Sequence, residues 1–161
     1  MEILKYPNPV LKKTSAAVLA VDEDDRSALE QMVKIMYLSH GVGLAAPQIG
    51  INKKLMVVDI GDKNILRLIN PVIIKVNGKE EMEEGCLSVP NIYVKVKRAN
   101  SIIIKALNEN GQPIRMEATG LLARVILHEM DHLNGKLIID HLNPIRRHRA
   151  LRESGYFKKQ K

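Results

Sequence analysis

The chain has 161 residues, 45% of them hydrophobic, with one cysteine and a formal net charge of +7. This length and composition predict one globular domain with a substantial core, and they exclude a fold held together by internal disulfides. No apolar run approaches the roughly 18 residues of a membrane-spanning helix, and the amino terminus lacks the apolar run of a signal peptide, so we expect a cytoplasmic protein without a membrane anchor.

The first predicted element is an amphipathic helix over residues 22–40. It opens with acidic residues, which suit the positive end of a helix, and its apolar residues recur at spacings of three and four. These apolar residues are Leu29, Met32, Val33, Met36 and Tyr37. We expect them to form one face of the helix.

Two groups of strands follow this helix. Residues 53–61 and 65–79 are rich in β-branched side chains, and two pairs of turn-forming residues punctuate them. These pairs are Asn70-Pro71 and Asn77-Gly78. In the second group, residues 92–118, apolar residues alternate at Ile92, Val94 and Val96, and the sequence NENG at 108–111 predicts a hairpin.

The pattern changes over residues 119–135, where apolar residues occur almost all round a helical wheel. Thr119 is a candidate N-cap, and Gly135 is a candidate residue for ending the helix. The segment is therefore predicted to be a helix buried among the strands.

Most of the positive charge lies at the carboxyl-terminal end. Residues 143–161 hold seven Lys and Arg against one acidic residue, a balance of +6, whereas residues 1–142 hold 18 against 17. Pro144 can begin a helix there, with few apolar residues to hold it to the core. We expect a basic helical tail that is not a separate domain, and it serves either as a solvated face or as a surface for an anionic partner.

The predicted buried helix contains HEMDH, an unusual set of polar residues for an apolar interior. His128 and His132 are four residues apart, so both imidazoles lie on one face of the helix, within reach of a single metal ion. Glu129 lies beside them as a candidate base. The pattern indicates a metal-dependent hydrolase.

Two histidines leave such a site short of protein ligands. A metzincin would have a third histidine at position 138, where this chain has Ile138, and a gluzincin would use a later glutamate, for which the candidate is Glu153. The remaining candidate is Cys86, because a thiolate is a strong metal ligand and the adjacent Gly85 allows a close approach of the backbone.

Three stretches together resemble one family. GVGLAAPQIG at residues 41–50, EGCLSVP at 84–90 and HEMDHLNG at 128–135 are similar to the three signature motifs of bacterial peptide deformylases, and the opening ILKYPNPVL is similar to the family's amino terminus. The resemblance implies an enzyme that removes the formyl group from the N-terminal formylmethionine of nascent polypeptides and releases formate. It also implies an α+β fold, in which strands of several small sheets wrap around a central helix carrying HExxH, with N-terminal and C-terminal helices.

The resemblance also assigns roles to residues of this chain. The implied metal ligands are Cys86, His128 and His132. The implied catalytic groups are Glu129 as acid and base, with Gln48 and the backbone N–H of Leu87 as donors to the oxyanion. The implied substrate-binding residues are Val42, Gly43, Met82, Gly85, Leu121 and Val125. The implied cofactor is one Fe(II) ion per chain, with Zn(II), Ni(II) or Co(II) as substitutes.

The division into domains and the partners follow from the same resemblance. Residues 1–142 would form the catalytic deformylase domain, and the tail over 143–161 would dock on the ribosome. The other partners would be nascent formyl-Met polypeptides, and we expect a monomer that does not bind membranes. Three residues depart from better-known members of the family, which leaves contacts beyond the formylmethionine open: Tyr93, Lys97 and Leu127.

Other functions compete with this prediction. A zincin-type metallopeptidase would use Glu153 or water as its extra ligand, and a nucleic-acid-binding module would use the basic tail. The sequence GVGLAA also fits the loosest dinucleotide fingerprint, but a predicted helix precedes it and Pro47 follows it, which is the wrong context for that fingerprint.

Overall fold

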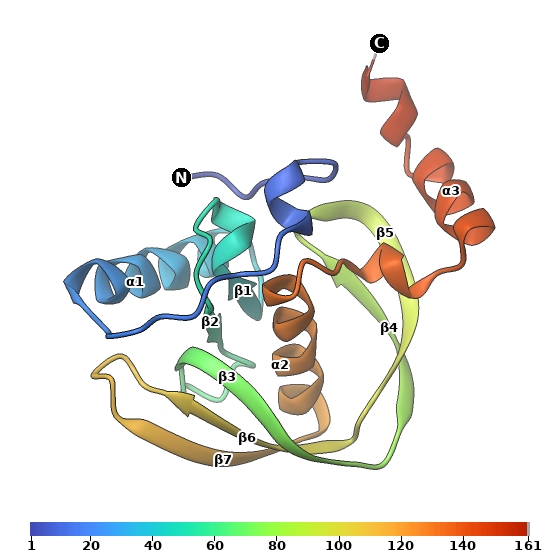
Figure 1. Cartoon of the computed structure of the whole chain (residues 1–161). Coiled ribbons are helices and arrows are strands. Elements are labelled where there is room, and N and C mark those ends of the chain that lie inside the picture. The colour runs from blue at the N-terminus through green and yellow to red at the C-terminus, as the bar shows by residue number, and fades with distance from the viewer. Residues whose placement is uncertain (161) are drawn as a thin grey trace.

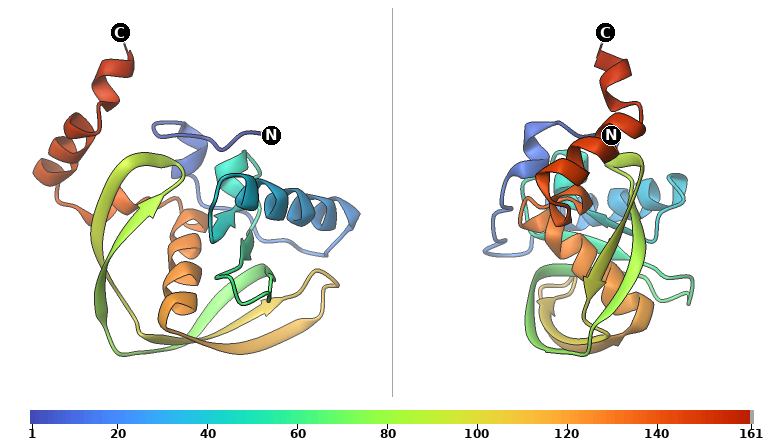
Figure 2. Two further views of the ribbon diagram at one scale, coloured as in Figure 1. Left: turned by 180° about the vertical axis from the view of Figure 1, so that it is seen from behind. Right: turned by 90° about the vertical axis from the view of Figure 1, so that its right-hand side faces the viewer.

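The structure, a computed structural model, describes residues 1–160 and has an α+β architecture (Figure 1). Strands of two antiparallel sheets surround a central helix, α2 (Gly120–Leu133), and α1 (Glu23–Leu38) lies to one side. The helix α3 (Pro144–Glu153) lies at the side of the molecule, beyond the smaller sheet, as Figure 1 and the left view of Figure 2 show. The predicted fold class, with small sheets around the helix that carries HEMDH, is confirmed.

The larger sheet has the strand order β1-β2-β3-β6-β7, and every neighbouring pair is antiparallel. Its strands are β1 (Gly43–Ala45), β2 (Leu55–Val58), β3 (Leu66–Asn77), β6 (Ser101–Leu107) and β7 (Pro113–Thr119). The smaller sheet consists of β4 (Glu80–Cys86) and β5 (Val89–Arg98). The predicted hairpin at residues 108–111 connects β6 to β7.

The helix α1 begins where the acidic residues predict it. Asp22 is the N-cap, and its side chain accepts a hydrogen bond from the backbone N–H of Asp25, whose carboxylate in turn accepts from the N–H of Asp22. This reciprocal pair satisfies two donors that the first turn would otherwise leave unpaired. Four of the five predicted apolar residues are buried, whereas Tyr37 is 46% exposed and contacts Asp59 instead.

The strand β3 corrects one prediction. Asn70-Pro71 does not form a turn between strands, because β3 runs through it as a single strand whose register against β6 shifts at this point. Asn70 has a left-handed backbone (φ 51°), and its side chain accepts from the N–H of Val18 and donates to the carbonyl of Val18. A bulge accommodates a proline, which has no N–H to give to the ladder.

The apolar face of α2 packs on the larger sheet. Its Ala123, Ile126 and Leu133 belong to a buried cluster that includes residues of β2, β3 and β6. Burial of each large side chain stabilises the fold by about 1.5–3 kcal/mol, so the packing fixes where the polar face of α2 points. Thr119 occupies the predicted N-cap position, although its side chain makes no capping hydrogen bond, and Gly135 follows the end of the helix with φ 70°.

Residues 1–160 also contain four short 3₁₀ helices: η1 (Pro9–Lys12), η2 (Ala46–Ile49), η3 (Ile138–His141) and η4 (Tyr156–Gln160). Pro144 begins α3 as predicted, after an N-cap at Asn143. The tail is held to the body more firmly than the sequence suggests, because Leu151 is buried and the ring of Tyr156 lies 5.2 Å from that of Tyr6. Among residues 1–160, no helix combines the length and apolar character needed to cross a bilayer.

Candidate active site

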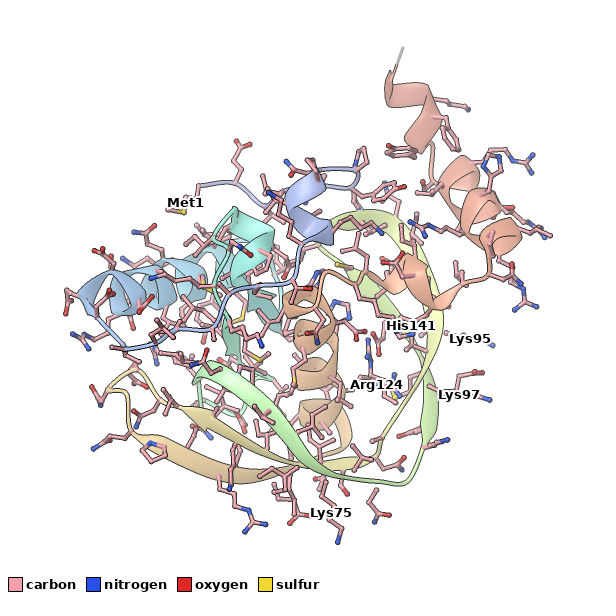
Figure 3. The ribbon with its side chains drawn as sticks, in the orientation of Figure 1. Met1, Lys75, Lys95, Lys97, Arg124 and His141 are labelled. Carbon is pink, nitrogen blue, oxygen red and sulfur yellow. The ribbon has the colours of Figure 1, made fainter. Side chains whose placement is uncertain are left out.

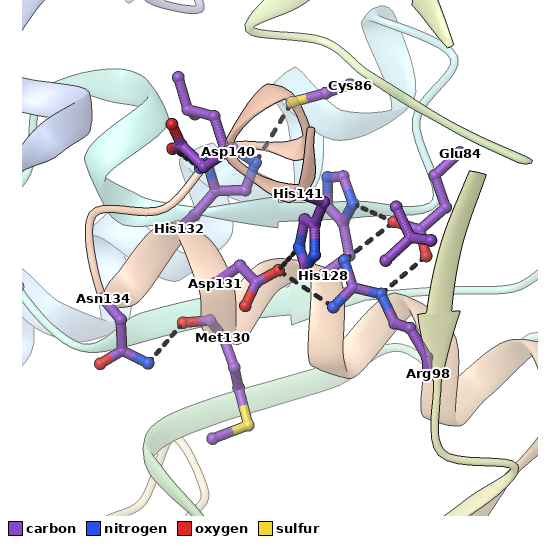
Figure 4. A network of polar contacts seen from close by, with 12 residues as sticks. Glu84, Cys86, Arg98, His128, Met130, Asp131, His132, Asn134, Asp140 and His141 are labelled. Carbon is purple, nitrogen blue, oxygen red and sulfur yellow. Dashed lines mark hydrogen bonds and ion pairs between the residues drawn. The ribbon is translucent and has the colours of Figure 1, made fainter. Parts of the chain in front are cut away.

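Three side chains with metal-binding atoms converge beside α2. His128 and His132 project from successive turns of the helix, and Cys86 reaches them from the end of β4 (Figure 4). Their ligand atoms all lie within 4.8 Å of one another, and Cys86 Sγ is 3.2 Å from Nε2 of His132. The structure therefore brings together the three residues that the sequence predicts as ligands.

The electrostatics of the two imidazoles fit a cation. Burial lowers the pKa of His132 well below its usual value, so its ring is neutral, which is the form that binds metals. Burial also opposes a charge on His128, but hydrogen bonds with Cys86 and Glu84 raise the pKa of its ring to about 10. The surroundings of His128 thus stabilise a positive charge at its ring. A metal ion bound to the ring would supply such a charge in place of the proton. One sulfur and two imidazole nitrogens suit Fe, Co, Ni or Zn.

The carboxylate of Glu84 orients His128. Glu84 is buried, and its Oε2 lies 2.9 Å from Nδ1 of His128. Arg98 donates Nε–H and Nη2–H to the two carboxylate oxygens at 2.7 and 2.9 Å (Figure 4). Burial would raise the pKa of Glu84, but these donors hold it well below its usual range. The ionised carboxylate therefore accepts the Nδ1–H of His128 and orients the ring so that a metal ion could replace the proton on Nε2.

Two further groups complete this buried network. Arg124, labelled in Figure 3, extends from α2 and donates to Glu84 Oε1 at 2.7 Å and to the carbonyls of Val96 and Glu80. Asp131 accepts from Arg98 Nη1 at 3.0 Å and lies 2.8 Å from Nε2 of His141. The network was not predicted. The only signal for it in the sequence is that an acid beside Gly85-Cys86 and an arginine on an apolar helix both need buried partners.

Glu129 is one of the residues that line the cavity beside these ligands. Its side chain is 4% exposed, and within residues 1–160 no group bonds to its Oε2. Burial raises its pKa to about 7, so the carboxyl group can exchange a proton near neutral pH. Gly43 lies so close that an added Cβ would be 2.5 Å from Glu129 Oε1 and 2.8 Å from a methyl of Val125.

The side chain of Gln48 is held in one orientation. Its Oε1 accepts from the backbone N–H of Ala45 at 2.9 Å, and its Nε2 donates to the hydroxyl of Ser88 at 3.2 Å. The same Nε2 is 4.0 Å from Cys86 Sγ, so the donor end of the amide points toward the candidate ligands. Leu87 follows Cys86 directly, which places its backbone N–H next to them.

A cavity of about 410 Å³ opens onto these groups. All six predicted substrate-binding residues line it: Val42, Gly43, Met82, Gly85, Leu121 and Val125. His132 is the one predicted site residue that is not among its lining residues. The sequence did not predict His40, Ile92 or Tyr93 as lining residues. The ring of Tyr93 lies close to Gly85, because a Cβ added to Gly85 would be 3.0 Å from a ring carbon of Tyr93.

An α+β fold that presents a Cys-His-His cluster and a buried glutamate to a cavity defines a metal-dependent hydrolase. The sequence also matches the family described as polypeptide deformylase over residues 1–148. The chain therefore belongs to the polypeptide deformylase family.

Curated relatives and solved structures agree with this assignment. The peptide deformylase of Thermodesulfovibrio yellowstonii is 44% identical over 151 residues, which cover 91% of this chain and 92% of that protein. The peptide deformylase of Halothermothrix orenii is 47% identical, with 87% and 92% covered. A crystal structure from Legionella pneumophila superimposes with a TM-score of 0.92 at 42% identity, and covers 99% of this chain and 95% of its own. A crystal structure from Synechococcus elongatus in complex with actinonin superimposes with a TM-score of 0.90 at 41% identity. The match covers 96% of this chain and 86% of that chain.

The predicted activity is confirmed at the level of the family. The chain is a peptide deformylase, a metal-dependent hydrolase that removes the formyl group from the N-terminal formylmethionine of nascent polypeptides and releases formate. The metallopeptidase alternative is not favoured, since the family and the structural relatives are deformylases.

Proposed function

We propose that Cys86, His128 and His132 hold one Fe(II) ion and that Glu129 is the acid and base of the deformylation. One observation carries this proposal: three ligand atoms lie within 4.8 Å of one another beside a buried carboxyl group whose Oε2 has no partner among residues 1–160. Zn(II), Ni(II) or Co(II) would fit the same donor set. The choice of iron comes from the resemblance to the family.

The cavity supplies the binding of the substrate. We assign the methionine side chain to the apolar side chains that line the cavity, which are Val42, Met82, Leu121 and Val125. Gly43 has no side chain to keep a peptide away from its backbone. These contacts would hold the formyl group near Glu129, which converts a bimolecular encounter into a positioned reaction.

Residues of the chain then transfer the protons and stabilise the charge that develops in the reaction. A bound metal ion supplies Lewis acidity, which lowers the pKa of water and polarises a carbonyl oxygen. Glu129 takes a proton from the attacking water and later gives it to the leaving amine. Gln48 Nε2 and the N–H of Leu87 donate to the oxyanion that forms at the formyl carbon, and each donor contributes about 3 kcal/mol.

The test of this proposal combines two measurements. Protein purified without oxygen should contain about one iron per chain and should release formate from a formyl-Met peptide. A protein with no iron that is fully active with another bound metal would contradict the choice of Fe(II), and formate release without bound metal would contradict the whole site.

We further propose that residues 1–142 are the catalytic domain and that the tail over 143–161 docks the enzyme on the ribosome in the cytoplasm. Three arginines of the tail are exposed on α3: Arg146, Arg149 and Arg152. Such a row of guanidinium groups suits the phosphates of RNA. From the resemblance alone, we also propose a monomer, which size-exclusion chromatography with light scattering would test.

A further inference from the structure

The amino-terminal segment Leu4–Tyr6 joins the two loops that carry the proposed oxyanion donors. The N–H of Leu4 donates to the backbone carbonyl of Gln48 at 2.7 Å, and the N–H of Tyr6 donates to that of Ser88 at 2.9 Å. Between them, Lys5 Nζ donates to the carbonyl of Leu87 at 2.5 Å. Three consecutive residues thus hold three carbonyls, one in η2 and two in the β4–β5 turn.

These bonds restrict the peptide groups around the donors. The carbonyl of Leu87, which accepts from Lys5, belongs to the peptide unit Leu87–Ser88, whereas the N–H of Leu87 belongs to the unit Cys86–Leu87, and each unit is rigid and planar. The two units share the Cα of Leu87, so the bond to Lys5, together with the position of Cys86 at the end of β4, holds both ends of the unit that carries the N–H. Oxyanion donors act only when they are aimed before the reaction, because reorientation during the reaction would cost the stabilisation that they supply.

We infer that Lys5 is a positioning residue for the deformylation: it fixes the Leu87–Ser88 peptide unit and so holds in place the neighbouring unit that carries the N–H of Leu87. The inference rests on the proposed role of Leu87 and Gln48. Lys5 is the member of the segment that can be tested, since the other two bonds come from backbone N–H groups that side-chain substitutions leave in place. The ring of Tyr6 also packs against that of Tyr156, and this contact helps to hold the segment in place.

The decisive variant is Lys5→Met, which keeps most of the alkyl stem and removes the donor. Because one bond from a charged donor is lost at an exposed site, we expect kcat for a formyl-Met peptide to fall about fivefold. KM should stay within twofold, because the segment is not part of the methionine pocket. Metal content and thermal midpoint should be unchanged. Lys5→Arg, which restores a cationic donor, should recover kcat to within twofold.

Two controls keep the outcome interpretable. Lys13→Met removes another exposed lysine from the same end of the chain and should leave kcat unchanged. Gln48→Ala, measured in parallel, tests the proposed oxyanion site itself. If Gln48→Ala lowers kcat while Lys5→Met does not, the inference about Lys5 is wrong and the proposed site stands. If Gln48→Ala keeps full kcat, the proposed site fails and this inference fails with it. A Lys5→Met variant that loses metal, or that raises KM alone, would also overturn the positioning role.

Discussion

At the scale of single residues, Cys86 is the site residue that no other thiol of the chain could replace. It is the only cysteine in the sequence, and its sulfur lies 3.2 Å from His132 Nε2. A thiolate is a softer and stronger ligand for iron than a hydroxyl group. As a proposed ligand, the sulfur of Cys86 would therefore influence which metals the site retains.

Cys86→Ser tests this role. The variant should lose most of its bound iron and most of its deformylase activity, while its circular dichroism stays that of the folded protein, because the side chain is only partly buried. Elemental analysis and a formate assay would measure both effects. A serine variant with full metal content and normal turnover would show that Cys86 is not a ligand.

Glu129→Gln separates proton transfer from metal binding. The amide keeps the size of the side chain but can neither take nor give the proton, so turnover should fall by about two or more orders of magnitude. Metal content should stay near one per chain, because Glu129 is not among the three proposed ligands. Activity within a few fold of the original enzyme would mean that another group moves the proton.

At the scale of elements, the sequence predicted best those features that local patterns encode. The spacing of His128 and His132, the apolar face of α1 and the alternation in β5 are periodic, so they could be located before the structure was known. The charged network around Glu84 depends on residues up to 44 positions apart that meet only after folding, and no periodicity marks such pairs. The hydrogen bonds from Leu4–Tyr6 could not be predicted for the same reason, because their acceptors lie far along the chain.

The bulge in β3 provides a prediction at this scale. Asn-Pro is a turn signal in the sequence, yet the side chain of Asn70 instead pairs with both backbone groups of Val18. Asn70→Ala would leave those two groups without protein partners. We expect a loss of about 1–3 kcal/mol in the free energy of unfolding.

Denaturant unfolding monitored by circular dichroism would measure the loss in Asn70→Ala. Asn64→Ala, in the loop before β3 where the side chain is exposed, is the matched control and should change the stability little. Equal stability of the two variants would mean that the Val18 contacts contribute nothing. Turnover at low temperature should be unchanged in both, since neither residue lines the cavity.

At the scale of the whole molecule, the tail provides a prediction about docking. Reversing the charge of its three exposed arginines to glutamate should reduce co-sedimentation with ribosomes at least tenfold at low salt. Leu151 and Tyr156, which hold the tail to the body, remain in place in this variant. Turnover of a short formyl-Met peptide should therefore stay within twofold.

The control for this experiment reverses three exposed lysines elsewhere: Lys34, Lys63 and Lys75. It changes the net charge by the same amount as the tail variant. Equal loss of binding in both variants would show that only the overall charge matters, and undiminished binding in the tail variant would show that the tail is not the docking surface. Binding of the unaltered protein should weaken steeply as salt is added.

The close approach of Gly43 to Glu129 limits which residues can stand at position 43. Any side chain at position 43 would have to displace the carboxyl group proposed to carry the protons or a methyl of Val125. The enzyme therefore has little freedom to change this position and remain active. A compound that binds through the backbone of Gly43 would therefore contact a part of the cavity that substitution at position 43 can hardly alter.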